Sequence, residues 1–268
     1  MCADECLFLV EKRSCSGHHF KDRVCPTTDL APAERLQNAR RNKLIVGYKS
    51  WILPAMNGCS PNQQPRKGTA HAPGACSMAP HIVAREAGHT FDLERVDIPN
   101  KKTADGGDYW KINPKGYVPA LMLDDGQVLT EVAVICQYLG DQKPQAGLVP
   151  QSGTMERYRL MEALNFASSE VHKQIGALFN PNLTAEMKEV QLGVIGRRLD
   201  ALEKLLDGNQ FITGDKYTVA DAYLFTVLNW TNIHKIDLAK WPNIKAYMAR
   251  IGARPKVQET MRAEGLLG

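Results

Sequence analysis

The chain contains the stretch NPKGYVPALMLDDGQVLTEVAVICQYLG at residues 113–140. Two short β-prone runs, residues 118–123 and 127–130, flank the turn residues Asp124-Asp125-Gly126, which is a typical hairpin signal. An apolar pattern with helical spacing follows over residues 131–140. This stretch therefore predicts a β-hairpin that leads directly into a helix.

Upstream of the hairpin, the pattern predicts a further helix and strand. Apolar residues recur at helical spacing from Ala79 to Ala87 and stop at Gly88, and residues 91–98 alternate loosely enough for a strand. This order suits a small α/β layer with helices against a mixed sheet. One strand is missing in front, because residues 68–72 (GTAHA) form a poor strand. The β-prone run Lys43–Tyr48 could fill that place.

Downstream of residues 143–153, a linker with two prolines and two glycines, the chain becomes helical. Three apolar faces at helical spacing predict an all-helical second domain. Their members are Leu160, Leu164, Val171, Ile175 and Leu178; Met187, Val190, Val194, Leu202 and Leu205; and Val219, Tyr223, Val227 and Leu228. The predicted parts are a poorly ordered extension over 1–67, an α/β domain over 68–143 and a helical domain over 152–268.

Composition excludes several classes of protein. The 268 residues carry a net charge of +4, and no apolar run approaches the roughly 20 residues of a membrane helix. The basic excess lies in residues 1–70, with 11 Lys and Arg against 6 Asp and Glu, and lacks the interleaved aromatics of a nucleic-acid surface. Seven cysteines, an odd number, argue against a disulfide framework, and the first 13 residues lack signal-peptide features. We therefore expect a cytoplasmic protein without nucleic-acid or membrane partners.

Cys76 is the first candidate for chemistry. It stands directly before the helix predicted from Ala79, near the positive end of the helix dipole, where a thiolate is favoured over a thiol. The alternative is a small buried residue at a helix start. Ser77 competes with Cys76 for the same role, and its own alternative is helix capping.

The segment around Val118-Pro119 is the second candidate. A cis bond there would expose the N–H and C=O of Val118 to an extended ligand, whereas a proline at the start of a strand needs no ligand. Glu131 opens the next predicted helix, so it could take an ammonium while free backbone N–H groups take a carboxylate. Its alternative is a first-turn glutamate that complements the dipole.

Further polar patterns have structural explanations. A polar stripe on the first long helix of the second domain is by default a solvated face; its members are Asn165, Ser168, Ser169, His172 and Lys173. Thr218 and Asp221 have the spacing of a capping box. The cysteines and histidines of residues 2–25 match no zinc-site spacing, so we expect no metal.

Taken together, these motifs resemble the bacterial beta class of glutathione transferases over about residues 71–268. The resemblance is carried by seven segments in order: 73–77 (PGACS), 80–82 (PHI), 101–103 (KKT), 113–119 (NPKGYVP), 129–131 (LTE), 170–173 (EVHK) and 211–225. It implies a thioredoxin-like domain followed by a helical domain, a homodimer, and glutathione as cosubstrate. The activity it implies is conjugation of glutathione to small hydrophobic electrophiles in detoxification.

The resemblance also implies roles for individual residues. Cys76 would face the glutathione sulfur, His172 would close the cleft from the second domain, and Trp230 would lie near the electrophile pocket. The expected catalytic residues are Cys76, His172 and Ser77, the last because it competes with Cys76 for the same role at the helix start. The predicted glutathione-binding residues are Lys101 for the glycyl carboxylate, Val118 and Pro119 for the cysteinyl backbone, Glu131 and Val132 for the γ-glutamyl end, and Asn165, Ser169 and Lys173 from the second domain or from that of a partner subunit.

Two departures from the family pattern keep other interpretations open. His71 replaces a tyrosine five residues before the cysteine, and Val132 follows Glu131 where the family has a small residue or serine. These favour a non-catalytic protein that retains the fold. Cys76 itself leaves open a glutathione-dependent disulfide reductase or dehalogenase, because a mixed disulfide with glutathione could form there.

Overall fold

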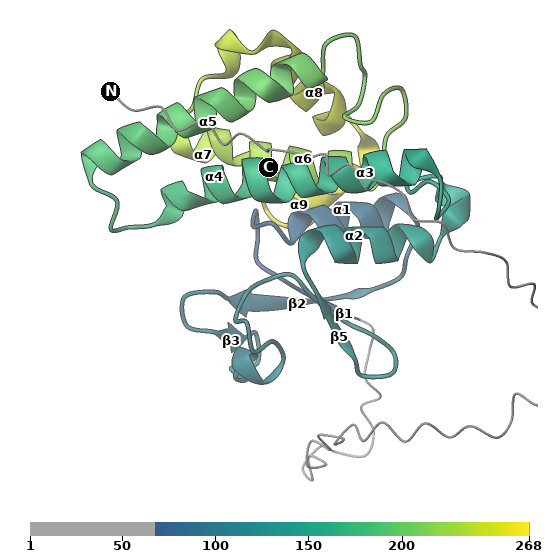
Figure 1. The fold of residues 1–268 in the computed structure, drawn as a ribbon. Helices are drawn as coiled ribbons and strands as arrows, with labels where there is room; N and C mark the ends of the chain where they lie inside the picture. The colour runs from purple at the N-terminus through teal and green to yellow at the C-terminus, as the bar shows by residue number, and fades with distance from the viewer. Residues whose placement is uncertain (1–67, 268) are drawn as a thin grey trace, which may run out of the picture. The chain divides into compact units, whose positions relative to one another are not determined.

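The computed structural model describes residues 68–267 of the chain. The predicted extension over 1–67 and the β-prone run Lys43–Tyr48 lie outside the described residues. In the part that is described, a small sheet domain precedes a domain made of helices (Figure 1). This arrangement confirms the expected α/β plus all-α fold class.

The sheet domain has five strands in the order β3-β2-β1-β4-β5. Its elements are β1 (Gly68–His71), α1 (Met78–Glu86), β2 (Asp92–Asp97), β3 (Lys102–Thr103), β4 (Ala120–Met122), β5 (Val128–Thr130) and α2 (Val132–Asp141). β1 runs parallel to β2 and antiparallel to β4, and the two outer pairs are antiparallel. The mixed sheet and the β4–β5 hairpin are as predicted.

The second domain is helical throughout its described length. Its elements are α3 (Met155–Phe166), a π-helical turn (Ala167–His172), α4 (Lys173–Gly176), α5 (Ala185–Leu205), α6 (Val219–Leu228), α7 (Trp230–His234), α8 (Pro242–Gly252) and α9 (Pro255–Ala263). α1 and α2 lie between the sheet and these helices (Figure 1), in contact with α6, and α1 also contacts α9. The two domains therefore share one continuous apolar core.

The expectation that residues 68–72 would not form a proper strand is wrong. Gly68–His71 is β1, the central strand, and Gly68 pairs with both Asp92 and Met122. Thr69, Ala70 and His71 are all buried, since neighbouring strands and packed side chains surround them. Strand propensity is weak evidence at such a position, because burial and cross-strand packing decide the outcome there.

A buried polar network joins the two domains beside the start of α1. The Glu264 carboxylate, just beyond α9, lies 2.8 Å from Nδ1 of His81 and accepts the backbone N–H of Gly74 at 2.9 Å. Arg85 donates to Nε2 of His81 at 3.0 Å, so the proton of a neutral imidazole is on Nδ1 and points to Glu264. Trp230 donates its indole N–H to Gly74 O at 2.8 Å. The loop before Cys76 is thus held by the helical domain through both polar groups of Gly74.

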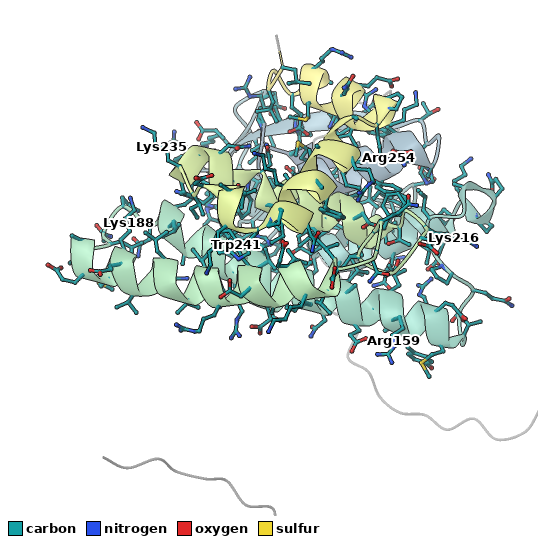
Figure 2. All side chains as sticks on the ribbon, turned by 90° about the horizontal axis from the view of Figure 1, so that it is seen from above. Arg159, Lys188, Lys216, Lys235, Trp241 and Arg254 are labelled. Carbon is teal, nitrogen blue, oxygen red and sulfur yellow. The ribbon has the colours of Figure 1, made fainter. Side chains whose placement is uncertain are left out.

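The long helix α5 differs from its predicted face. Met187 and Val190 are exposed, and the buried stripe is Ile195, Leu199 and Leu202. The stripe packs against α8, whose N-cap residue Trp241 lies over α5 (Figure 2) and donates its indole N–H to Asp200 at 2.8 Å.

The predicted capping box at the start of α6 is confirmed. The Asp221 carboxylate accepts the backbone N–H of Thr218 at 2.7 Å and its hydroxyl at 3.0 Å. It also accepts the N–H of Ile212 at 2.9 Å and the hydroxyl of Tyr247 at 3.0 Å. These four contacts satisfy a carboxylate that is completely buried at the centre of the helical domain.

Candidate active site

A cavity of about 250 Å³ lies where the sheet domain meets the helical domain. The sheet domain lines it with Cys76, Asn113, Lys115, Tyr117, Val118, Pro119, Thr130, Glu131 and Val132, and the helical domain with Ser168, His172, Lys173 and Tyr223. Seven predicted site residues meet here from four separate segments: Cys76, Val118, Pro119, Glu131, Val132, His172 and Lys173. Convergence of residues so distant in sequence identifies this cavity as the candidate active site.

Cys76 reaches the cavity from the turn that precedes α1. Its thiol donates to the backbone oxygen of Val118 at 3.1 Å. Burial raises the pKa of this thiol to about 12, although the backbone N–H groups of Cys76 and Ser77 act in the opposite direction. The expectation of a resting thiolate is therefore wrong, because loss of hydration outweighs the field of the helix start.

The peptide bond between Val118 and Pro119 is cis, and both residues line the cavity. The backbone N–H of Val118 has no partner among the residues that the structure describes. Tyr109 and Asn113 donate to the neighbouring carbonyl of Tyr117 at 2.8 and 2.7 Å. The segment is held from behind and leaves a backbone donor free for an extended ligand.

Glu131 precedes α2 with a φ of 72°, an uncommon conformation for a residue with a side chain. Its carboxylate accepts from the Lys115 ammonium at 2.7 Å, and both side chains are more than half exposed. Such an exposed pair contributes only about 0–1 kcal/mol, so a ligand ammonium can replace Lys115 at little cost. Strained backbone at a cavity wall is typical of functional sites.

Val132 is the first residue of α2 and is buried against the cavity. Its aliphatic side chain offers no hydroxyl to a ligand. The first backbone N–H groups of the helix begin here, and this end of a helix favours anionic groups.

The helical domain contributes through the π-helical turn Ala167–His172. Single π turns within longer helices often occur at functional sites. This turn brings Ser168, His172 and Lys173 to the cavity. Asn165 and Ser169 do not line it: both are exposed, and the Ser169 hydroxyl donates back to the Asn165 carbonyl at 3.0 Å. Their predicted role came from the family resemblance, which also allows them to serve a partner subunit.

His172 is held in place by Tyr223, with 2.7 Å between Nδ1 and the phenol oxygen. Burial lowers the pKa of His172 from 6.5 to about 4, and the charge of Lys173 adds to this effect, whereas Glu131 opposes it. The imidazole is therefore neutral at pH 7. A neutral imidazole can donate one hydrogen bond and accept another. It can therefore either accept from a bound thiol or donate to it.

The lowered pKa of His172 predicts that acid weakens the fold. Between pH 6.5 and 4 the unfolded chain binds a proton that folded His172 does not, so stability falls as the pH falls. We expect this one group to remove about 2.5 kcal/mol of unfolding free energy between pH 7 and pH 4.5. Urea unfolding of the unaltered chain and of His172→Gln at both pH values measures it. Equal losses in the two proteins would contradict the assignment.

An aromatic wall lies behind His172. Trp230 is buried, with its ring centroid 5.0 Å from that of His172 and 5.3 Å from that of the half-exposed Phe179. Gly176 lies against both His172 and Trp230, where even a Cβ atom would be 3.6 Å from each ring. Trp230 itself is not part of the cavity lining.

Two further predicted site residues lie outside the cavity lining. Ser77 is completely buried, and its hydroxyl exchanges hydrogen bonds with the backbone of Ala72 at 3.1 and 3.2 Å. Its side chain does not cap α1 and does not line the cavity, so the structure adds no support to its assignment as a catalytic residue. Lys101 lies beyond Tyr117, with its ammonium donating to the Gly116 carbonyl at 2.7 Å.

Several lining residues were not predicted as site residues. Lys115 and Tyr117 belong to the segment 113–119, which also contains Val118 and Pro119. Their position near Val118 in the sequence is the feature from which they could have been predicted. Ser168 was noted only as part of a polar stripe. Tyr223 follows the apolar spacing of α6, and nothing in that pattern separates it from a core residue.

Other features of the described chain carry no comparable chemistry. A larger cavity of about 460 Å³ lies between α3 and residues 205–214, and its charged residues, Arg159 and Glu162, pair with each other at 2.7 Å. In residues 68–267, no group of three or more His, Cys, Asp or Glu is placed to hold a metal ion. None of the described helices is both long and apolar enough to cross a membrane.

Comparison with known families gives two matches that together span most of the described chain. Residues 74–142 match the model of the glutathione S-transferase N-terminal domain, and residues 166–255 match that of the glutathione S-transferase C-terminal domain.

Individual relatives agree with these matches. Glutathione S-transferase GstA of Escherichia coli O157:H7 is 42% identical over 196 residues, which are 73% of this chain and 98% of that protein. The structure of a bacterial beta class glutathione S-transferase from Sphingomonas chungbukensis is 44% identical, with a TM-score of 0.73, over 75% of this chain and 100% of the other. A sphingomonad glutathione S-transferase in complex with glutathione is 42% identical, with a TM-score of 0.72 and the same coverage of 75% and 100%.

Proposed function

This chain belongs to the glutathione S-transferase family, and from that premise we propose that it conjugates reduced glutathione to small hydrophobic electrophiles at the cavity around Cys76. The main observation in support of this proposal is that seven predicted site residues line a single cavity between the two domains. Glutathione is the cosubstrate. It resembles an extended peptide with a thiol at its centre, and an extended ligand suits a cavity that runs along Val118.

The charges around the cavity suit this cosubstrate. Glutathione carries an ammonium and two carboxylates, and the rim offers one carboxylate, Glu131, and the ammonium groups of Lys115 and Lys173. The γ-glutamyl ammonium would take the Glu131 carboxylate, while the carboxylate beside it would meet the first N–H groups of α2. The cysteinyl backbone would use the free N–H of Val118.

The chemistry needs the glutathione thiol to lose its proton and its sulfur to attack an electrophilic carbon, which releases the leaving group. The neutral thiol of Cys76, the backbone N–H groups beside it and neutral His172 all provide donors for a sulfur anion. Each unit by which they lower the thiol pKa corresponds to about 1.4 kcal/mol. Phe179 and Trp230 lie behind His172 rather than in the cavity lining, so the expected hydrophobic character of the electrophile rests on the family resemblance.

Cys76 also supports a second candidate, a glutathione-dependent disulfide reductase or dehalogenase. The raised pKa of its thiol counts against this candidate, because the thiolate is the reactive species. The third interpretation, a non-catalytic protein, was based on a defective first strand and on Val132, and only the first of these is removed by the structure, since β1 pairs on both sides.

Replacement of Cys76 by alanine separates conjugation from thiol exchange. We expect Cys76→Ala to retain conjugation of 1-chloro-2,4-dinitrobenzene within about fivefold, because the loss is one neutral hydrogen bond. Reduction of a glutathione mixed disulfide should disappear in the same variant. Steady-state assays of both reactions, with Cys136→Ala as the matched thiol control, provide the measurement. Complete loss of conjugation in Cys76→Ala alone would favour the exchange mechanism.

We further propose a homodimer that acts in detoxification in the cytoplasm, where reduced glutathione and free thiols coexist. Exposed apolar side chains on α2 and α3 support self-association; they are Val134, Met155, Tyr158 and Met161. Asn165 and Ser169 lie on the same helical segment, outside the cavity of their own chain, so they could serve a partner subunit. Sedimentation velocity tests the assembly: a monomer at micromolar concentration would contradict it.

A further inference from the structure

Two large aromatic side chains are exposed at one edge of the active-site cavity. Trp110 is 48% exposed and Tyr117 is 70% exposed, and Tyr117 lines the cavity directly. Neighbouring exposed aromatic rings at the rim of a ligand site often have a recognition role.

The two rings share one cation. The Lys101 ammonium lies 5.7 Å from the centroid of the Trp110 ring and 5.5 Å from that of Tyr117. Both distances are within the range of cation–π attraction. The same ammonium donates to the Gly116 carbonyl at 2.7 Å, so it has contacts on three sides.

Backbone contacts hold the segments that carry Lys101, Trp110 and Tyr117. Tyr109 is completely buried, and it donates its N–H to Lys101 O at 2.9 Å and its hydroxyl to Tyr117 O at 2.8 Å. Trp110 lies so close to Gly116 that a Cβ atom there would be 2.5 Å from the indole ring. Gly116 also has a φ of 67°, so a glycine is required on both counts.

The arrangement leaves Lys101 ready to bind an anion. An ammonium has three N–H donors, and one of them is used by Gly116. A free lysine side chain loses about 1.5–2 kcal/mol of conformational entropy when a ligand immobilises it. The rings and the carbonyl already restrain Lys101 in the free protein, so binding of a ligand costs less conformational entropy.

We propose that Trp110 and Tyr117 are positioning residues that hold the Lys101 ammonium for the glycyl carboxylate of glutathione. This inference rests on the proposed function and deepens it. Lys115 and Lys173 lack such a holder: Lys115 pairs with Glu131, and neither lysine lies over an aromatic ring in the described part of the chain. Lys101 therefore differs from the two lysines that line the cavity, because only Lys101 is restrained by aromatic rings.

The test compares glutathione with its glycyl monoethyl ester in steady-state conjugation assays. With glutathione, Trp110→Ala and Tyr117→Ala should each raise KM about fivefold and leave kcat within twofold, because each removes one cation–π contact. Trp110→Phe and Tyr117→Phe keep a ring and should restore most of the affinity. With the ester, which lacks the glycyl carboxylate, Trp110→Ala should equal the unaltered chain. Lys101→Met should abolish the preference for glutathione over the ester.

Two results would overturn the proposal: equal losses with glutathione and the ester in Trp110→Ala, or an unchanged KM for glutathione in both alanine variants. An unaltered chain that does not distinguish glutathione from the ester would overturn it too, while leaving the transferase assignment intact. If the unaltered chain conjugates neither compound, the proposed function itself fails. Phe variants that behave as the Ala variants do would likewise contradict a role for the rings.

Discussion

Replacement of Glu264 by alanine is expected to lower the free energy of unfolding by about 2–4 kcal/mol, because the buried His81 N–H and the Gly74 N–H lose their acceptor. The carboxylate and its partner His81 are both completely buried, 2.8 Å apart. The substitution leaves the completely buried His81 ring and the partly buried Gly74 N–H without their acceptor. An unsatisfied buried donor costs far more than the intact contact contributes.

A matched control lies in the same region of the chain. Glu259 on α9 pairs with Lys256 at 2.9 Å and with Arg85 at 3.8 Å, and its side chain is 40% exposed. Glu259→Ala should therefore cost less than about 1 kcal/mol. Urea unfolding followed by circular dichroism compares the two variants. Similar small losses in both would show that the Glu264 network does not hold the domains together.

The second large effect is expected at Glu131. Glu131→Ala should raise the KM for glutathione by about 10- to 100-fold, because it removes a charged acceptor for the γ-glutamyl ammonium. Alanine retains a Cβ atom, so both proteins carry the same backbone strain at the φ of 72°. The expected loss therefore reports the carboxylate rather than the conformation. The change in kcat should be small, since the ammonium lies far from the sulfur in the peptide.

Glu156 provides the matched substitution. It is an exposed glutamate in the first turn of α3, outside the cavity, so Glu156→Ala removes the same charge without touching the site. The KM of Glu156→Ala for glutathione should stay within twofold of that of the unaltered chain. An unchanged KM for glutathione in Glu131→Ala would contradict the assignment of Glu131 to the γ-glutamyl ammonium.

Local patterns were sufficient to predict most of the fold. The hairpin around Gly126, the first helix ending near Gly88 and the capping box of α6 each depend on residues close together in sequence, and all three are present. β1 could not be predicted in this way. Its Gly-Thr-Ala-His sequence becomes a strand only because β2 and β4 pair with it on both sides.

The site residues could likewise be predicted where nearby sequence determines their position, and not where distant segments do. Motif residues around Val118 and Glu131 were placed correctly at the cavity, because the short segments that carry them fold locally. Asn165 and Ser169 do not line the cavity of their own chain, so their role in glutathione binding stays a prediction about a partner subunit. The pKa of Cys76 depends on burial by distant segments, which the helix start alone does not reveal.

The most direct test of the account is calorimetric titration of the full-length chain with reduced glutathione, beside an identical titration of Glu131→Ala. We predict one glutathione bound per chain, with affinity at least tenfold weaker in the variant. Absence of binding to the unaltered chain at millimolar glutathione would contradict the central claim that the cavity around Cys76, Val118 and Glu131 is a working glutathione site.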